Sequence, residues 1–286
     1  MTTASIADET PMPRFGGMSP LPPASGRAGF GGALRSEWTK ISSVKSTLWS
    51  LAAAIVIGVG ISILGNWGQA SHTTDSAAEL AQKDLVQRTM FGIILGQLVM
   101  VVFGAVAVTS EYATGMIRTS LTAQPRRGNV FFAKLVVVTL VAFVVGEIIS
   151  FASFLIGAHF WVAKGVSLNL GTHGALQAVI GGGLYLDGAA LLAFGIGAAL
   201  RHTAGAITVG VALLFVVNII TNFMPDSWQK DIDKYLPYNA GSQVWATQHT
   251  ADVGTAFGAW AGFAVYMVYA VIALILGLWV FKRRDA

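Results

Sequence analysis

The 286-residue sequence contains no cysteine and very little charge. Without cysteine there can be no disulfide framework, no thiolate zinc site and no thiol nucleophile. Charged residues make up only 11% of the chain, against about 25% in an ordinary soluble domain. The chain therefore offers no soluble face on which basic residues could gather to bind nucleic acid.

Sequence motifs for nucleotide binding and metal catalysis are also missing. There is no G-x-x-x-x-G-K-[ST] phosphate loop and no H-E-x-x-H pair. The five histidines are scattered along the chain, at His72, His159, His173, His202 and His249, so we expect no metal site. We also expect no catalysis by this chain and no cofactor bound to it.

Long apolar runs are abundant, and hydrophobic residues make up 54% of the sequence. A helix of about 20 residues crosses the roughly 30 Å hydrocarbon core of a bilayer. Six segments meet that length, at about residues 47–66, 89–109, 129–157, 176–200, 204–223 and 256–281. We predict an all-α integral membrane protein with six transmembrane helices. The third segment is long enough to require tilt or an exposed start.

The N-terminal region divides into two parts. Residues 1–32 are rich in Pro, Gly, Ser and Thr and are predicted to form a disordered tail before a single membrane domain, residues 33–286. In the following segment Leu34, Trp38 and Ile41 recur at helical spacing, with basic residues between them. This pattern favours a helix lying at the membrane surface, and the alternative is a simple basic flank to the first span.

The distribution of basic residues predicts the orientation. If the N-terminus lies inside, thirteen of the eighteen lysines and arginines fall on the inside. Both termini are therefore expected to be cytoplasmic. The tight turn LRHTAG between the fourth and fifth segments makes these two helices antiparallel neighbours.

The most polar structured stretch is Ser110–Lys134, SEYATGMIRTSLTAQPRRGNVFFAK, which would join spans two and three on the cytoplasmic side. Ser110 can cap a short helix that carries Glu111, Gly115 and Arg118 on one face. Alternatively Glu111 ends the second span and pairs with Arg118. Such an element suits docking of a soluble partner, although a basic inside loop that meets lipid phosphates would look similar.

Two carboxylates, Glu147 and Asp187, are predicted at similar depth near the middle of the third and fourth spans. Burying an acid in a membrane is expensive, so both are candidates for a translocation path or a proton relay. They could equally be neutral acids that bridge helices. The run Gly181–Gly183 just before Asp187 indicates either a hinge or close helix packing.

Three segments of the sequence resemble the membrane subunits of ABC-2 type transporters, and they follow one another along the chain in the order found in that family. Many of these carry E-Y/F-x-x-G-x-I-R-x-x-L-x-x-x-P-R-R between spans two and three, followed by a lysine entering span three. The segment at Leu34–Thr47 is similar to the helix before the first span of actinobacterial members, and YLPYNAG at Tyr235–Gly241 is a third match. In the loop the matching residues are Glu111, Tyr112, Gly115, Ile117, Arg118, Leu121, Pro125, Arg126, Arg127 and Lys134.

The resemblance implies a permease subunit with the ABC-2, type V exporter-like architecture in a bacterial plasma membrane. In that family the loop between spans two and three is a coupling helix that docks on a separate ATPase subunit. Docking roles are therefore expected for Glu111, Gly115, Arg118, Arg126 and Arg127. ATP and magnesium would bind to the partner, and a second permease subunit, identical or different, would complete the transporter.

Two other functions agree with the same residues. The first is an ion-coupled secondary transporter that uses Glu147 and Asp187. The second is a membrane scaffold or immunity-type protein that transports nothing. The first requires an ion gradient and no ATPase, whereas the second tolerates neutralisation of both acids.

Overall fold

The computed structural model describes residues 29–117, 126–221, 223–225, 232–247 and 257–283, and within these ranges every regular element is a helix. Among the described residues, six helical stretches are long and apolar enough to cross a membrane, in agreement with the predicted all-α class and six spans. Five are single helices: α2 (Lys45–His72), α5 (Gly92–Ala113), α7 (Arg127–Val162), α8 (Ala175–Leu200) and α13 (Ala259–Arg283). The remaining one, Thr203–Thr221, is made of α9 (Thr203–Val211), the π-helix η1 (Ala212–Val216) and α10 (Val217–Thr221).

Helix α8 is the centre of the bundle. In its most apolar part 83% of the residues are buried, against 17% in the most apolar part of α13, and α8 packs against α5, α7 and α13. Small residues permit this close approach. A Cβ placed on Gly104 of α5 would lie only 2.0 Å from the carbonyl oxygen of Ala190 in α8. A Cβ on Gly195 of α8 would lie 2.5 Å from the backbone of Ala273 in α13.

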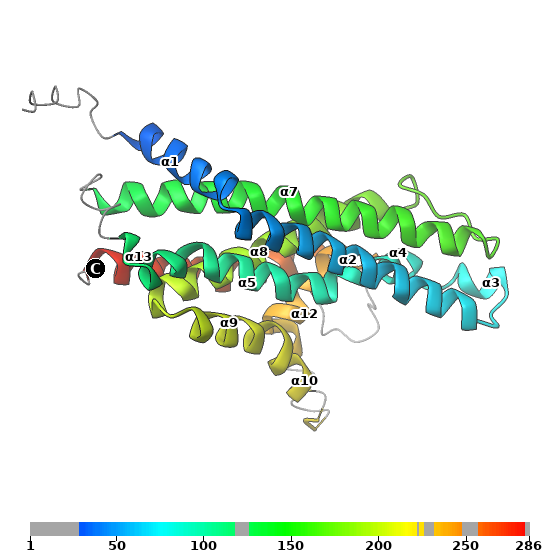
Figure 1. Cartoon of the computed structure of the whole chain (residues 1–286). Coiled ribbons are helices and arrows are strands. Elements are labelled where there is room, and N and C mark those ends of the chain that lie inside the picture. The colour runs from blue at the N-terminus through cyan, green and yellow to red at the C-terminus, as the bar shows by residue number, and fades with distance from the viewer. Residues whose placement is uncertain (1–28, 118–125, 222, 226–231, 248–256, 284–286) are drawn as a thin grey trace, which may run out of the picture.

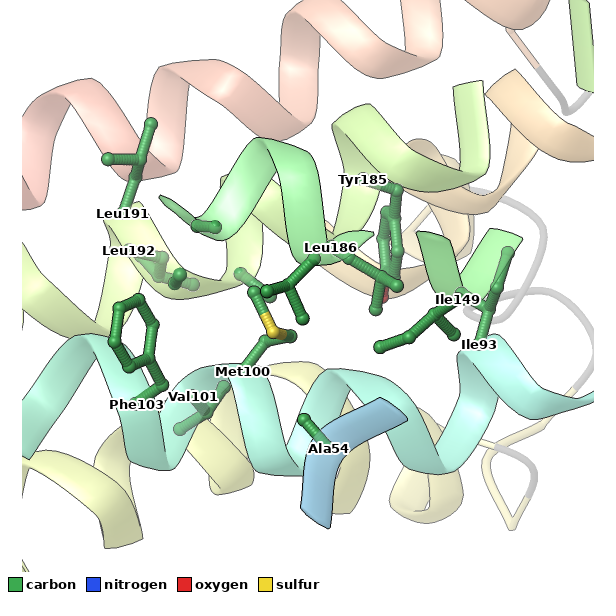
Figure 2. Close-up of a cluster of buried hydrophobic side chains, with 14 of the residues drawn as sticks. Ala54, Ile93, Met100, Val101, Phe103, Ile149, Tyr185, Leu186, Leu191 and Leu192 are labelled. Carbon is green, nitrogen blue, oxygen red and sulfur yellow. The ribbon is translucent and has the colours of Figure 1, made fainter. Parts of the chain in front are cut away.

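Larger apolar side chains fill the space that remains between the helices. Figure 2 shows Met100 and Phe103 of α5 facing Leu186 and Leu192 of α8, with Ile149 of α7 beside them. All five are at most 4% exposed. This cluster holds the helices in register and fixes the places of the polar side chains described below.

Helix α7 is far longer than a bilayer requires. Its 36 residues span about 54 Å at 1.5 Å per residue, against a hydrocarbon core of about 30 Å. Helix α1 (Phe30–Ser43) packs against it, and Figure 1 shows α1 running obliquely along α7 before the chain enters α2. The break between α1 and α2 is at Val44, whose backbone is extended. The start of α7, the end of α5, α1 and the end of α13 all lie at one end of the bundle, called the charged end below (Figure 1).

Short helices lie in the half of the bundle away from the charged end. They are α3 (Ala77–Leu80), α4 (Leu85–Thr89), η2 (Asp233–Tyr235), α12 (Pro237–Ser242) and η3 (Gln243–Trp245). Pro237 begins α12, where its fixed φ and missing N–H suit the first helical turn. Val244 and Trp245 are buried against the bundle, and the Trp245 ring meets the Tyr185 ring edge to face.

Candidate functional site

Four charged side chains from three helices form a closed ring at the charged end. Lys40 Nζ lies 2.7 Å from Oε1 of Glu37 and 2.7 Å from Oε1 of Glu111. Lys134 Nζ lies 2.6 Å from Oε2 of Glu37 and 2.8 Å from Oε1 of Glu111. This charge ring, Glu37, Lys40, Glu111 and Lys134, joins α1, α5 and α7.

The charge ring is largely hidden from solvent. The side chains of Glu37, Glu111 and Lys134 are between 5% and 8% exposed, and only Lys40 reaches 28%. Burial alone lowers the pKa of Lys40, but hydrogen bonds to Glu111 and Glu37 outweigh it and leave this pKa raised above its ordinary value of 10.5. A buried ion pair that loses one partner leaves an uncompensated charge, so the ring fixes the relative positions of its three helices.

The charge ring explains why Glu111 is where it is. Ser110 and Glu111 belong to the last turn of α5, so Ser110 does not cap a separate helix as one of the two interpretations held. Glu111 ends the second span, as the other interpretation proposed, and its partners among the described residues are Lys40 and Lys134. The residue proposed to pair with it, Arg118, lies outside the described residues. Through these two ion pairs Glu111 fixes the end of α5 from inside the bundle.

Three other residues expected to dock a partner, Gly115, Arg126 and Arg127, follow the end of α5 or lie at the start of α7. After Thr114, which ends α5, Gly115 takes a left-handed conformation with φ of 71°, and residues 116 and 117 are helical again. Ile117 is buried, which anchors the start of this segment. Arg126 stands exposed directly before α7, and Arg127 begins it.

Two arginines bind the C-terminal carbonyls of α13 at the same end. Arg127 Nη1 donates to the carbonyl oxygen of Lys282 at 3.5 Å, and Arg201 Nη2 donates to that of Val280 at 3.2 Å. The Arg201 guanidinium also lies 5.0 Å from the centre of the Tyr112 ring. Helix ends leave carbonyls unpaired, and basic side chains commonly satisfy them. The last span is thereby tied to α5, α7 and α8.

Deeper in the bundle lie two acids, Glu147 and Asp187, that have no hydrogen bond or ion pair with the described residues. Both carboxylate oxygens of Glu147 and Oδ1 of Asp187 are buried and accept no hydrogen bond from the described residues. A Cβ placed on Gly183 would lie 2.4 Å from Cδ of Glu147, so this carboxyl rests against α8 one helical turn from Asp187. Gly183 precedes Asp187 by four residues, so the Glu147 carboxyl lies about 6 Å along the axis of α8 from the level of Asp187.

Two polar side chains close to these acids in the sequence bond elsewhere. The Tyr185 hydroxyl donates to the side-chain oxygen of Gln97, and the Ser150 hydroxyl donates to the carbonyl of Val179. Helix α8 runs unbroken through Gly181–Gly183, which agrees with close packing rather than local unwinding. Each glycine makes room for a different neighbour, and Gly183 makes room for Glu147.

Sequence reasoning missed half of the charge ring. Glu37 and Lys40 were assigned to a surface helix, yet Glu37 is the buried residue of α1. A signal was present: Glu37 and Lys40 are three residues apart on one helix face, and Lys134 and Glu111 were already noted as parts of the loop motif. The two acids and two bases lie in segments that are otherwise poor in acid. Such a balance of charge indicates that the residues pair with one another across the fold.

A comparison with protein families gives one result that covers most of the chain. The family model described as a protein of unknown function, DUF2705, matches residues 45–286. No curated protein matches the chain. The match includes all six membrane-spanning helices, and the chain therefore belongs to the DUF2705 family.

Proposed function

We propose that the chain is the membrane-spanning permease subunit of an ATP-driven exporter of the ABC-2 type. It forms the translocation path in the plasma membrane of a bacterium, with both termini in the cytoplasm. A separate ATPase subunit, which binds ATP and magnesium, docks on the segment between α5 and α7. A second permease subunit, identical or different, completes the transporter.

The observation that carries this proposal is the charge ring behind that segment. A docking element must transmit force, and force is transmitted only by groups that move together. The segment between α5 and α7 begins three residues after Glu111 and ends eight residues before Lys134, and both residues bind to α1 as well. Displacement of the segment would therefore move three helices as one unit.

The loop motif supports the same function. Gly115 provides the sharp bend after α5, and Arg126 is exposed at the entrance to α7. Exposed guanidinium groups form bidentate hydrogen bonds with carboxylates, which suits an acidic groove on a partner. Glu111 contributes from inside by holding the ends of α5 and α7 together.

The test is copurification from native membranes. The wild-type chain should bring down an ATPase subunit, and Arg118→Glu should lose it. The matched control is Lys164→Glu, a charge reversal at an exposed lysine beyond the far end of α7. Equal recovery of the ATPase with both variants would reject docking at this segment.

Orientation provides a second test of the same proposal. The chain has no cysteine, so a single introduced cysteine is the only thiol that a label can reach. Arg126→Cys should be labelled only when the cytoplasmic face is opened, and Lys164→Cys should be labelled from outside intact cells. The reverse pattern would place the docking segment on the wrong side of the membrane.

A second candidate function rests on the two unpartnered acids. An ion-coupled transporter needs carboxylates inside the membrane that can take up and release protons, and Glu147 and Asp187 are enclosed there. This function predicts proton movement into vesicles that contain the purified chain alone, detected with a pH-sensitive dye. Glu147→Gln would abolish it, whereas an ATP-driven permease without its ATPase would show no such movement.

A further inference from the structure

The exposed tryptophans of two helices mark the same two levels along the bundle. Trp260 and Trp279 of α13, and Trp49 and Trp67 of α2, are each more than half exposed. At 1.5 Å per residue, the two tryptophans of a helix are about 28 Å apart in α13 and about 27 Å apart in α2. Both spacings match the hydrocarbon core of a bilayer, and tryptophan is enriched at its two interfaces. Trp279, near the end of α13, therefore lies at the headgroup boundary of the charged end (Figure 1).

Near this boundary the outer face of α13 changes from apolar to basic. The residues Ile272, Leu276, Trp279 and Arg283 are four, three and four positions apart, so they lie along one side of the helix. The first three are more than half exposed, and Arg283 is exposed as well. The Arg283 guanidinium lies 4.5 Å from the centre of the Trp279 ring. This side presents hydrocarbon, an aromatic ring and a cation in the order in which a leaflet presents acyl chains, interface and phosphate.

A second exposed cation, Lys282, is the neighbouring residue. A Cβ placed on Gly128 of α7 would lie 3.8 Å from Cε of Lys282, so this side chain lies against the start of α7. Phe281 is buried, and its ring centre lies 5.6 Å from that of Phe131 in α7. Arg127 donates to the Lys282 carbonyl. The last turn of α13 is therefore fixed against α7, and the fold sets the positions of both cations.

Within the described residues, no acid neutralises these two cations. The acidic side chains described at the charged end are Glu37 and Glu111, and both bind the lysines of the charge ring. Lys282 and Arg283 form no ion pair in the part of the chain that the structure describes. An anionic headgroup of the surrounding leaflet would therefore meet two uncompensated positive charges.

We propose that this end of α13 binds a phospholipid with net negative charge. Its phosphate lies between Arg283 and Lys282, and an acyl chain follows the face of the helix past the Trp279 ring. A guanidinium binds two phosphate oxygens at once and an ammonium binds them as a point charge, so the two groups complement each other. A soluble protein partner fits less well, because the part of this face that precedes Trp279 is inside the hydrocarbon core.

The inference depends on insertion into a bilayer and does not depend on the proposed transport function. The two cations are not among the residues assigned to ATPase docking. Failure of the inference would therefore leave that function untouched.

The experiment is native mass spectrometry of the full-length protein, titrated with phosphatidylglycerol and phosphatidylcholine that have identical acyl chains. Phosphatidylglycerol should bind at least about fivefold more tightly, since only this lipid carries a net charge that the two cations attract. Lys282→Gln combined with Arg283→Gln should bring the two lipids to equal affinity. Both side chains are exposed, and the Lys282 carbonyl that Arg127 binds is retained, so this double variant should fold.

The matched control is Arg35→Gln combined with Lys45→Gln, which removes two exposed cations of α1 and α2 at the same end. The control should keep the preference for phosphatidylglycerol. Equal loss of the preference in both double variants would mean that the lipid responds only to the total charge of this end, and would overturn the inference. Equal binding of the two lipids by wild type would overturn it as well.

Two further outcomes would replace the lipid by another occupant. Glycerol phosphate that binds as tightly as phosphatidylglycerol would refute the contact with the acyl chain, and with it the lipid. A wild-type dimer that binds no phosphatidylglycerol and dissociates when Lys282 and Arg283 are both changed to glutamine would show that a second copy covers this face. Either result would overturn the inference.

Discussion

The molecule holds two pairs of acidic side chains in opposite environments. Glu37 and Glu111 each bind both lysines of the charge ring, with every nitrogen-to-oxygen distance at 2.8 Å or less. Glu147 and Asp187 lie deeper, and the described residues give them neither a hydrogen bond nor an ion pair. The two lysines of the charge ring balance the charge of the first pair. No described residue balances the charge of the second pair or accepts its proton.

This difference separates a structural role from a functional one. Paired charges between helices fix register, and their loss is paid in stability. An acid that no neighbour stabilises adds nothing to the fold, so its presence in an apolar span indicates a function. The variants of the charge ring and of Glu147 and Asp187 are each expected to affect one of these two pairs and leave the other unchanged.

The largest effect should come from Lys134→Met. This change removes a lysine that binds both Glu37 and Glu111 and leaves two glutamates sharing one cation. Breaking a buried ion pair costs about 3 to 5 kcal/mol, so the free energy of unfolding in mixed detergent micelles should fall by that amount. Lys164→Met, at an exposed lysine, should change it little.

A double variant identifies the cause of that loss. Lys134→Met combined with Glu37→Gln removes one charge of each sign and keeps the ring neutral. The double variant should therefore lose less than the sum of the two single changes. Strict additivity would mean that the two residues do not act as a pair.

The next effect is expected from Glu37→Gln alone, which weakens the attachment of α1. Hydrogen bonds to charged groups contribute about 1.5 to 3 kcal/mol, and Glu37 makes two of them, one to each lysine. Local opening of α1 should increase, so trypsin should cleave faster at Arg35. Glu79→Gln, at an exposed acid of α3, serves as the control, and equal cleavage of both variants would show that Glu37 does not hold α1.

The unpartnered acids should behave differently. Glu147→Gln with Asp187→Asn removes no hydrogen bond or ion pair with the described residues, so the free energy of unfolding should change by less than about 1 kcal/mol. A loss as large as that of Lys134→Met would show that these acids hold the fold, and the comparison would fail. A stable variant that no longer moves protons or exports would assign them to the path.

The spans were predictable because hydrophobic length is a local property of the sequence. The start of α8 and the start of α9 were each placed within one residue, at 176 and 204 against Ala175 and Thr203. The first span was placed too short, since α2 continues to His72 through a polar stretch that hydropathy alone does not count as helix. The two ends of an apolar run can be read from the sequence. The extension of a helix beyond that run into polar residues cannot.

The charge ring was not predictable in the same way. Glu37 and Lys134 are 97 positions apart, and nothing local to either residue selects the other. Its formation depends on α1 packing along the start of α7, which is a tertiary contact. The same reason applies to Glu147 and Gly183, whose contact appears only when α7 and α8 are brought together.

The smallest effect is expected at a partly exposed ion pair, Asp75 with Lys83, at the end opposite the charge ring. Hydrogen bonds from Lys83 and Thr73 hold the pKa of Asp75 below its ordinary value of 3.8. A lowered pKa means that this pair stabilises the fold above pH 3.8 and that its contribution disappears as the pH falls through the folded-state value.

Asp75→Asn should therefore match wild type in melting temperature between pH 5 and pH 8, apart from a small constant difference, because exposed pairs contribute little. The two curves should converge only below pH 3.8. Lys40 behaves oppositely: its raised pKa keeps its contribution intact below pH 10.5 and loses it at higher pH. A difference between Asp75→Asn and wild type as large as that of Lys134→Met would mean that burial does not distinguish the two kinds of pair, and the contrast between the charged end and the rest of the molecule would lose its physical basis.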